Sequence, residues 1–377
     1  MSNPIRVLNI TRVFKAAGIE SFIMNMYRNI DRSKVQFDFL VMSGEESCYD
    51  EEIHKLGGRK YTIDIKADNT FIKIQKEAKA LYDFLQKHEY KIIHIHYTTP
   101  LRAPYLLAAK KAGVPVRIYH SHSAEVSGKS KVKLLVYNYY RNRISKWATA
   151  EYACSKAAAY WMFEKKLIDN GTVQIIYNGI DTARFTYNPK IREEMRKNLN
   201  LENNFVIAHT GRFLPQKNHH FIIDVFNEVK KREYDAKLLL LGIGELQDEI
   251  RQKVNKLGLS NDVYFLGVRK NVEDYLSAAD CYIMPSLYEG LPVAAVEAEC
   301  SGLPCIMSTK ITEEVALTSN VVFLHLDDSL KVWAEEVIKT KSTHRRDESE
   351  VITQKGYNVK SVAHKLQNQY LNLIKGK

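Results

Sequence analysis

The sequence predicts an α/β fold of two doubly wound domains, each with a parallel sheet that carries helices on both faces. Two observations lead to this prediction. Short apolar runs alternate with segments of helical periodicity, and the alternation starts again near the middle of the chain. The length of 377 residues agrees, because a chain of this size can fill two hydrophobic cores.

The predicted strands are short apolar runs, six in each half of the chain. Those of the N-terminal half are 5–10, 37–42, 61–65, 92–96, 116–119 and 173–177. Those of the C-terminal half are 205–209, 237–241, 263–266, 281–285, 305–308 and 321–324. Helices lie between them; the first is marked by Ile19, Phe22, Ile23 and Met26, whose spacing of three and four places them on one face. That face should pack on the first sheet.

The boundary between the domains falls in a polar stretch that contains Pro189 and ends in a charged segment, 191–200, which could form one surface helix. We therefore expect an N-terminal domain at 1–183, a linker at 184–204 and a C-terminal domain at 205–355. The remaining residues, 356–377, have apolar positions at helical spacing. They should form a C-terminal helix that could pack back on the N-terminal domain.

The composition narrows the classes of function. A formal net charge of +11 favours an anionic partner: nucleic acid, an acidic lipid surface or a phosphate-bearing substrate. The basic residues are spread over both halves without a nucleic-acid-binding signature, which argues against nucleic acid. No G-x-G-x-x-G follows the first strand, which argues against a dinucleotide oxidoreductase. No apolar run is long enough to span a bilayer and no leader pattern begins the chain, so we expect a cytoplasmic protein.

The most informative segment is 285–297, where an apolar strand ends, a loop carries Glu289 and Gly290, and a helix should begin near Pro292. A glycine-bearing loop and a helix N-terminus present free N–H groups and a positive dipole end, which suits a diphosphate. Glu289 and Glu297 could then reach two parts of one ligand, such as a sugar ring and a ribose. Alternatively, both are solvated surface carboxylates.

A second segment, 209–218, directly follows the first strand of the C-terminal half. Ligands of doubly wound sheets bind at the carboxyl ends of strands, so Arg212 and Lys217 could contact phosphate oxygens there. The chain has no Asp-x-Asp pair to hold a bridging metal, and the two cations would have to neutralise the diphosphate instead. Alternatively, both are ordinary loop charges.

Together these segments resemble the retaining glycosyltransferases of family 4, whose GT-B fold has two Rossmann-like domains facing each other across a cleft. The Glu-x7-Glu motif of that family corresponds to Glu289 through Glu297. Further matches occur in the same order along nearly the whole chain: Gly18-Ile-Glu20, His120-Ser-His122, Asn178-Gly-Ile-Asp181, Gly211-Arg-Phe213, Lys217, Leu241-Gly-Ile-Gly244, Phe265-Leu-Gly-Val268 and Ala279-Asp280.

The resemblance implies a role for each matching residue. Arg212 and Lys217 would stabilise the donor diphosphate as the glycosidic bond breaks, and Glu289 would contact the donor sugar. The implied catalytic residues are Glu289, Arg212, Lys217, His120 and His122. The implied donor-binding residues are Gly18, Gly211, Gly242, Gly244, Val268, Gly290, Leu291, Val293 and Glu297. Family members retain the anomeric configuration by a route that needs neither a protein nucleophile nor a metal, so no cofactor besides the nucleotide sugar is expected.

Two histidine pairs need separate interpretation. His120 and His122 alternate along an extended segment, and we expect them to point to opposite faces, which leaves open which one lies near the donor sugar. His94 and His96 share one face of the preceding strand, but a metal site needs more ligands than they offer. We expect them to be core or rim histidines and predict no metal site.

The segment 129–147 is basic and aromatic, has no acidic residue and should be helical. Such a helix suits contact with anionic lipid, near an acceptor carried on a lipid diphosphate. Alternatively, it packs an apolar stripe on its own domain and solvates its charges.

The expected activity is transfer of a sugar from a nucleotide diphosphate, uridine-linked by preference, to a saccharide acceptor in the synthesis of capsule, exopolysaccharide or another surface glycan. A lipid-linked acceptor would place the enzyme at the inner face of the cell membrane. One alternative is a nucleotide-sugar epimerase of the same fold. The other, from a different class, is a basic nucleic-acid-binding protein.

Overall fold

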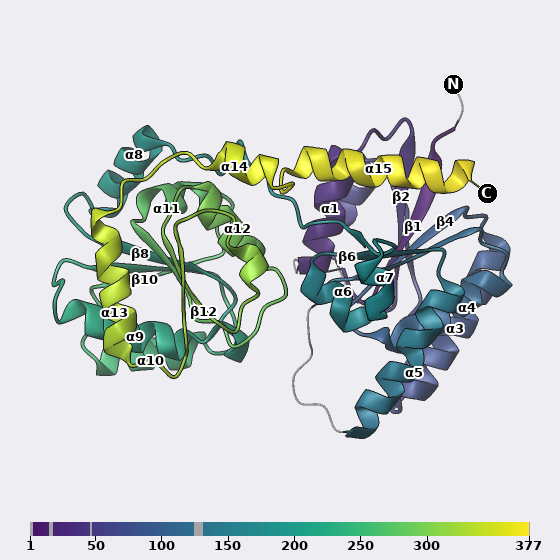
Figure 1. Ribbon diagram of the computed structural model, residues 1–377, viewed down its shortest axis with the longest axis horizontal. Helices are drawn as coiled ribbons and strands as arrows, with labels where there is room; N and C mark the ends of the chain where they lie inside the picture. The colour runs from purple at the N-terminus through teal and green to yellow at the C-terminus, as the bar shows by residue number, and fades with distance from the viewer. Residues whose placement is uncertain (1–2, 15–17, 46, 124–130, 377) are drawn as a thin grey trace. The chain divides into compact units, whose positions relative to one another are not determined.

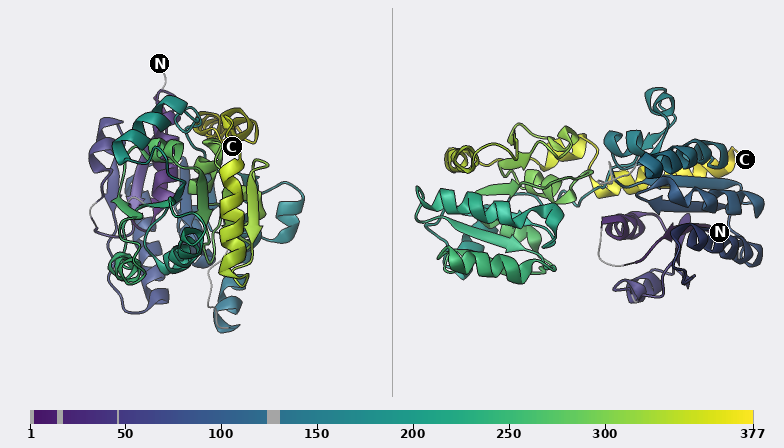
Figure 2. Two further views of the ribbon diagram at one scale, coloured as in Figure 1. Left: turned by 90° about the vertical axis from the view of Figure 1, so that its left-hand side faces the viewer. Right: turned by 90° about the horizontal axis from the view of Figure 1, so that it is seen from below.

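The computed structural model describes residues 3–14, 18–45, 47–123 and 131–376, which form two compact units (Figure 1). Unit 1 consists of Met1–Gly179 and Val359–Lys377, and unit 2 consists of Ile180–Asn358. Each unit contains one parallel sheet with helices on both sides (Figure 2). The predicted fold class is confirmed.

The sheet of unit 1 is parallel throughout, in the order β3-β2-β1-β4-β5-β6-β7. Its strands are β1 (Ile5–Thr11), β2 (Val35–Val41), β3 (Lys60–Thr62), β4 (Ile92–Tyr97), β5 (Val116–Ser121), β6 (Ala150–Ala153) and β7 (Gln174–Ile175). The predicted strands are confirmed with shifted ends. Strand β6 was not predicted, because four residues that include two alanines and Glu151 do not form an apolar run.

Two sets of helices cover the two faces of this sheet. One face packs against α1 (Gly18–Asn29) and the other mainly against α3 (Thr70–Lys87), α4 (Ala103–Lys111), α5 (Lys131–Trp147) and α6 (Lys156–Met162). The shorter helices are α2 (Asp50–Lys55), α7 (Lys165–Asp169) and the 3-10 turn η1 (Pro100–Arg102).

The last helix, α15 (Val359–Lys375), belongs to unit 1, where it lies beside α1 (Figure 1). Its residues Val362, Leu366 and Tyr370 are buried in the same core as α1. The backbone of Val359 lies so close to Gly179 that a Cβ there would be 2.8 Å from the Val359 Cα. A side chain at position 179 would therefore displace the start of α15.

The sheet of unit 2 repeats the same strand order, β10-β9-β8-β11-β12-β13, again all parallel. Its strands are β8 (Val206–Thr210), β9 (Lys237–Leu241), β10 (Val263–Gly267), β11 (Cys281–Met284), β12 (Cys305–Ser308) and β13 (Val321–Leu324). Its helices are α8 (Pro189–Leu199), α9 (His219–Lys230), α10 (Gln247–Lys256), α11 (Val272–Ala278), α12 (Val293–Cys300), α13 (Leu330–Lys339) and α14 (Ser349–Gln354), with the 3-10 turns η2 (Pro215–Lys217), η3 (Glu313–Val315) and η4 (Thr340–Ser342).

The segment expected as a linker, 184–204, is part of unit 2. Its helix α8 is fixed there because Arg192 and Arg196 both hold the carboxylate of Asp280, which follows α11. The Asp280 carboxylate also accepts the N–H of Val206 at 2.8 Å and so joins α8 to the first strand of the sheet. The polar composition of the segment thus reflects ion pairing rather than a free connection.

In both sheets the strand order reverses next to the first strand, between β1 and β4 in unit 1 and between β8 and β11 in unit 2. Loops leave the sheet in opposite directions at such a point and open a crevice at the carboxyl ends of the strands, where ligands bind in this class of fold. Each unit therefore has one crevice in which to look for functional side chains.

Candidate active site

The two loops at the switch point of unit 2 are fastened to each other. One follows β8 and contains Gln216; the other follows β11 and contains Leu287 and Tyr288. The Leu287 N–H donates to the Gln216 carbonyl at 2.8 Å, and the Gln216 side chain donates to the Tyr288 carbonyl at 2.9 Å. The Asn218 amide adds a bond to the Pro285 carbonyl at 3.2 Å. The structure therefore brings together the two segments that the sequence singled out.

An ion pair joins the predicted catalytic residues of these loops. Lys217 Nζ lies 2.7 Å from Glu289 Oε1, and only 17% and 10% of the two side chains is exposed. Arg212 is exposed, and its guanidinium makes no hydrogen bond or ion pair with the part of the chain that the structure describes. The Lys217 charge is thus already paired, whereas that of Arg212 is available to an anion.

The helix α12 begins beside this pair. Pro292 is its N-cap rather than its first residue and provides no side-chain cap. The N–H groups of Gly290, Leu291 and Val293 have no acceptor among the described residues. Unpaired N–H groups at a helix N-terminus favour an anion, and here they lie next to Glu289 in the chain.

Glu297 lies one turn into α12 and is partly buried. Burial raises its pKa to about 8, and the nearby Arg184 opposes this rise only in part. Arg184 is itself engaged by Glu273 at 2.7 Å, so Glu297 has no strong cationic partner. Below its pKa the Glu297 carboxyl is neutral and can both donate and accept, which suits a pair of hydroxyl groups.

The glycines of unit 2 have packing reasons for their identity. A Cβ at Gly242, where φ is +136°, would lie 2.1 Å from the Gly211 carbonyl oxygen. A Cβ at Gly244 would lie 2.5 Å from the Phe213 carbonyl oxygen. These glycines allow the loops after β8 and β9 to pack closely. Val268 follows β10 and is exposed, so its backbone is open to a ligand.

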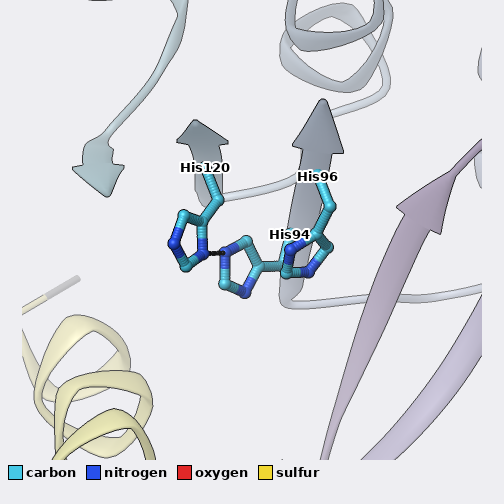
Figure 3. Close-up of side chains that lie close together, drawn as sticks. All are labelled: His94, His96 and His120. Atoms are coloured by element: carbon cyan, nitrogen blue, oxygen red, sulfur yellow. Dashed lines mark hydrogen bonds between the residues drawn. The ribbon is translucent and has the colours of Figure 1, made fainter. Parts of the chain in front are cut away.

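In unit 1, four histidines gather at the carboxyl ends of β4 and β5. The rings of His94 and His96 lie 3.9 Å apart, and those of His120 and His122 lie 4.1 Å apart. Figure 3 shows three of them; His94 and His120 face each other from neighbouring strands. The expectation that His120 and His122 point to opposite faces is wrong, because residues two apart in an extended strand share a face.

The four rings form two hydrogen-bonded pairs. His94 Nε2 lies 3.2 Å from His120 Nδ1, and His96 Nδ1 lies 3.0 Å from His122 Nε2. Ring nitrogens of His94, His96 and His120 lie within 4.8 Å of one another. His120 is thus a third potential metal ligand beside His94 and His96, the two that were considered from the sequence. Their hydrogen bonds run to one another, to Tyr370 and to Asn9, and none of the described carboxylates orients them.

The partners of one pair fix its tautomers. Asn9 Oδ1 accepts from His96 Nε2 at 3.1 Å, so His96 Nδ1 carries a lone pair and accepts from His122 Nε2. His122 Nδ1 then also carries a lone pair. Burial lowers the pKa of His122 to about 3, which keeps the ring neutral. The structure thus offers His122 as a hydrogen-bond acceptor at the edge of the sheet.

Sequence comparison identifies the family. The family description "Glycosyl transferases group 1" matches residues 190–355, and "Glycosyltransferase Family 4" matches residues 16–184. The putative glycosyltransferase EpsF of Bacillus subtilis is 34% identical over 98% of this chain and 97% of its own length. The chain is a glycosyltransferase of family 4.

Further relatives and solved structures agree. A galactosyltransferase of Escherichia coli, named for UDP-Gal and GlcNAc-diphosphoundecaprenol, is 27% identical over 82% of each chain. HepE of Anabaena, crystallised with UDP, superposes with a TM-score of 0.69 at 20% identity over 98% of this chain and 97% of its own. A glycosyltransferase of Rickettsia africae superposes with a TM-score of 0.78 at 16% identity over 100% of both chains. The glycosyltransferase therefore has the GT-B fold.

Sequence reasoning missed two buried histidines of this glycosyltransferase, His209 and His219, below the loop of Lys217. His209 Nε2 and both ring nitrogens of His219 have no partner among the described residues. Burial lowers the pKa of His219 to about 4, and Lys217 adds to this effect. His209 lies within the apolar strand β8, and a histidine in such a strand is the sequence feature that could have pointed to it. Both rings place neutral polar groups beneath the candidate diphosphate site.

The remaining predicted site residues lie in unit 1. Gly18 begins α1, and a Cβ there would meet nothing within 4 Å. Residues 15–17 of the same loop lie outside the described residues. The predicted basic helix is α5; residues 129 and 130 of that prediction also lie outside the described part. Among the described helices, none is both long and apolar enough to cross a membrane.

Proposed function

We propose that this glycosyltransferase transfers a sugar, with retention of configuration, from a UDP-sugar to a saccharide acceptor in the synthesis of a surface polysaccharide. The relatives support the process: one is named for capsular polysaccharide biosynthesis in Staphylococcus aureus and is 26% identical over 89% of this chain. The solved structures support the donor, since HepE was crystallised with UDP and with UDP-glucose. A relative that acts on a diphosphoundecaprenol acceptor supports a lipid-linked acceptor.

The observation that carries the proposal is the Lys217–Glu289 ion pair beside the unpaired Arg212 and the open N-terminus of α12. A donor diphosphate provides the oxygens that Arg212 and these N–H groups lack. It also competes for Lys217, and this releases the Glu289 carboxylate to accept hydroxyl groups of the sugar. In the absence of donor, the Lys217–Glu289 ion pair thus holds both side chains in place. The donor would then replace this ion pair with its own contacts to each side chain.

The chemistry follows from this placement. As the glycosidic bond breaks, negative charge grows on the leaving phosphate, and fixed cations and N–H groups stabilise that charge most in the transition state. The acceptor hydroxyl attacks from the same face, and the leaving phosphate oxygen takes its proton. Glu297 would hold the ribose hydroxyls. Arg212, Lys217 and the α12 N-terminus would make a metal unnecessary, so activity should persist in a chelator.

The direct test measures donor binding and transfer together. UDP should raise the melting temperature more than ADP, GDP or a nicotinamide dinucleotide, because a ligand stabilises only the state that binds it. Lys217→Ala and Glu289→Gln should each lower kcat/KM by about 100-fold or more, the range typical of lost electrostatic stabilisation. Lys331→Ala, at an exposed lysine of α13, is the matched control and should behave as wild type.

Full activity in either site variant, with a normal melting temperature, contradicts the assignment of the site. Product analysis separates the activities. A glycoside product with the α configuration from an α-linked donor supports the proposal. An inverted product, or an epimerised nucleotide sugar formed from the donor alone, contradicts it.

A further inference from the structure

Arg102 of unit 1 is a largely buried arginine whose guanidinium Nε has no hydrogen-bond acceptor among the described residues. It ends η1, directly after β4, and only 13% of its side chain is exposed. Its Nε is fully buried and has no hydrogen-bond partner among the residues that the structure describes. Burial acts to lower the pKa of the guanidinium, but the charges of Tyr105, Tyr97 and Glu77 outweigh this effect and raise the pKa. An arginine offers five donors, and leaving them unpaired away from water is unfavourable.

The nearest carboxylate does not account for this arginine. Glu77 Oε2 lies 3.7 Å from Arg102 Nη2, which is an ion-pair distance but not a hydrogen bond. The same oxygen accepts from the Tyr105 hydroxyl at 2.5 Å, and the other lies 3.9 Å from Lys73 Nζ. Glu77 therefore balances one positive charge of two, and the Nε of Arg102 stays without an acceptor among the described residues.

A second unpartnered group lies next to Arg102. The hydroxyl of Tyr97, the last residue of β4, is buried near Arg102 and Tyr105 and makes no hydrogen bond of normal geometry with the described residues. Burial raises the pKa of Tyr97 to about 12, so the phenol stays a neutral donor. The Arg102 guanidinium lies 5.5 Å from the Tyr97 ring and 5.8 Å from the Tyr105 ring, which holds it between two aromatic faces.

The backbone between these two residues is fixed. The Tyr119 hydroxyl donates to the Thr99 carbonyl at 2.7 Å, and the Trp161 indole donates to the Thr98 carbonyl at 2.9 Å. These bonds come from β5 and α6, so the loop is held by two neighbouring elements. The loop also lies at the carboxyl end of β4, beside the switch point with β1. A preorganised pair of donors at this place fits an oxyanion.

We propose that Arg102 and Tyr97 form an oxyanion subsite in unit 1 that binds a phosphate or carboxylate group of the acceptor substrate. The anion binding rests on unit 1 alone, whereas its link to the acceptor rests on the proposed function. Phosphate and carboxylate share the paired oxygens that a guanidinium fork recognises. The acceptor is thus an anionic saccharide or a saccharide on a phosphate.

The test titrates the full-length protein with methyl phosphate and, separately, with glucuronate, which distinguishes a phosphate from a carboxylate source. Saturating UDP occupies the donor site, and a parallel series uses Lys217→Ala to weaken anion binding there. Melting temperature is the readout. At least one probe should give a saturable increase in wild type. Arg102→Gln should weaken that binding by about tenfold or more, as expected for charge-assisted hydrogen bonds.

Two further variants separate binding from a structural role. Arg102→Lys keeps the positive charge but loses the planar guanidinium that donates two parallel hydrogen bonds, so this variant should also bind the probe more weakly. Tyr97→Phe removes only the hydroxyl; it should keep the wild-type melting temperature without a probe and lose part of the shift with one. Arg102→Gln, Arg102→Lys and Tyr97→Phe should all keep the UDP shift of wild type. Equal probe affinity in wild type, Arg102→Gln and Tyr97→Phe, or no saturable shift with either probe, overturns the subsite. If UDP does not change the melting temperature of the wild-type protein but the probes do, the proposed UDP-sugar donor is wrong instead.

Discussion

Single glycines in this glycosyltransferase serve two different purposes. Gly242 has a left-handed φ of +136° and lies against the Gly211 carbonyl oxygen, where a methyl group has no room. Gly18 lies at the first position of α1, where a Cβ would meet no described residue within 4 Å. The first glycine is required by the packing of unit 2. The second has no packing reason, which is consistent with close approach of a ligand.

The two alanine variants should therefore separate folding from binding. Gly242→Ala should lower the melting temperature of unit 2, because the backbone is strained and the clash is with backbone atoms. Gly18→Ala should leave the melting temperature unchanged or slightly higher, since alanine favours a helix, and should raise the KM for the donor. Thermal unfolding and donor kinetics on both variants check this. A stable Gly242→Ala protein, or a Gly18→Ala enzyme with unchanged KM, contradicts the corresponding assignment.

At the scale of one element, α5 exposes apolar side chains among basic ones. Leu135 is 70% exposed and Leu134 is 42% exposed, whereas Ile144 of the same helix is buried. The described part of the helix carries Lys133, Arg141, Arg143 and Lys146 and no acidic residue. The apolar stripe that was expected to pack on the helix's own domain is therefore present on unit 1, and the two leucines are left exposed. We propose that these leucines contact an anionic membrane.

This proposal predicts the behaviour of leucine variants. Replacing Leu134 and Leu135 by serine should reduce binding to phosphatidylglycerol vesicles by about tenfold or more, because burying a leucine side chain contributes about 1.5–3 kcal/mol. Tyr234→Ser, which changes an exposed aromatic residue of unit 2, is the control and should bind as wild type. Flotation with vesicles that contain or lack phosphatidylglycerol provides the measurement. Undiminished binding by the leucine variant rules out this helix as the contact.

Elements and site residues differed in how far the sequence could predict them. Apolar strands such as β9 and β12 were predicted to the residue, because burial on both faces leaves a continuous apolar run. Strand β6 has no such run, and its place in the sheet depends on pairing with β5. The family motifs in the sequence predicted that Lys217 and Glu289 belong to the same site. They could not reveal Arg102, because the absence of an acceptor is visible only once the surrounding side chains are placed.

For the whole molecule, the buried titratable groups predict that acid affects the two units unequally. In unit 1, burial lowers the pKa of His94, His96, His120 and His122. The unfolded chain then binds more protons below pH 6.5, so stability present above pH 6.5 is lost as the pH falls. Each histidine accounts for at most about 1.4 kcal/mol per pH unit.

Unit 2 carries opposing groups. Its His209 and His219 also have lowered pKa values, but burial raises the pKa of Glu297 to about 8 and that of Glu299 to about 7. A carboxyl with a raised pKa binds a proton more tightly in the folded state, so it adds stability as the pH falls from 8 toward 4.5. Between pH 6.5 and 5 these contributions oppose those of the two histidines. In unit 1, burial also raises the pKa of Glu151, which opposes the effect of the four histidines.

Acidification from pH 7 to 5.5 should therefore lower the denaturant midpoint of unit 1 more than that of unit 2. Tryptophans report on each unit separately: Trp147 and Trp161 lie in unit 1 and Trp333 in unit 2. Trp333→Phe leaves the signal of unit 1, and the double variant at 147 and 161 leaves that of unit 2. His122→Asn, which removes one of the four histidine rings with a lowered pKa, should reduce the acid sensitivity of unit 1 by about a quarter. Equal shifts of the two midpoints, or a larger shift in unit 2, would show that the buried histidines do not control the acid response.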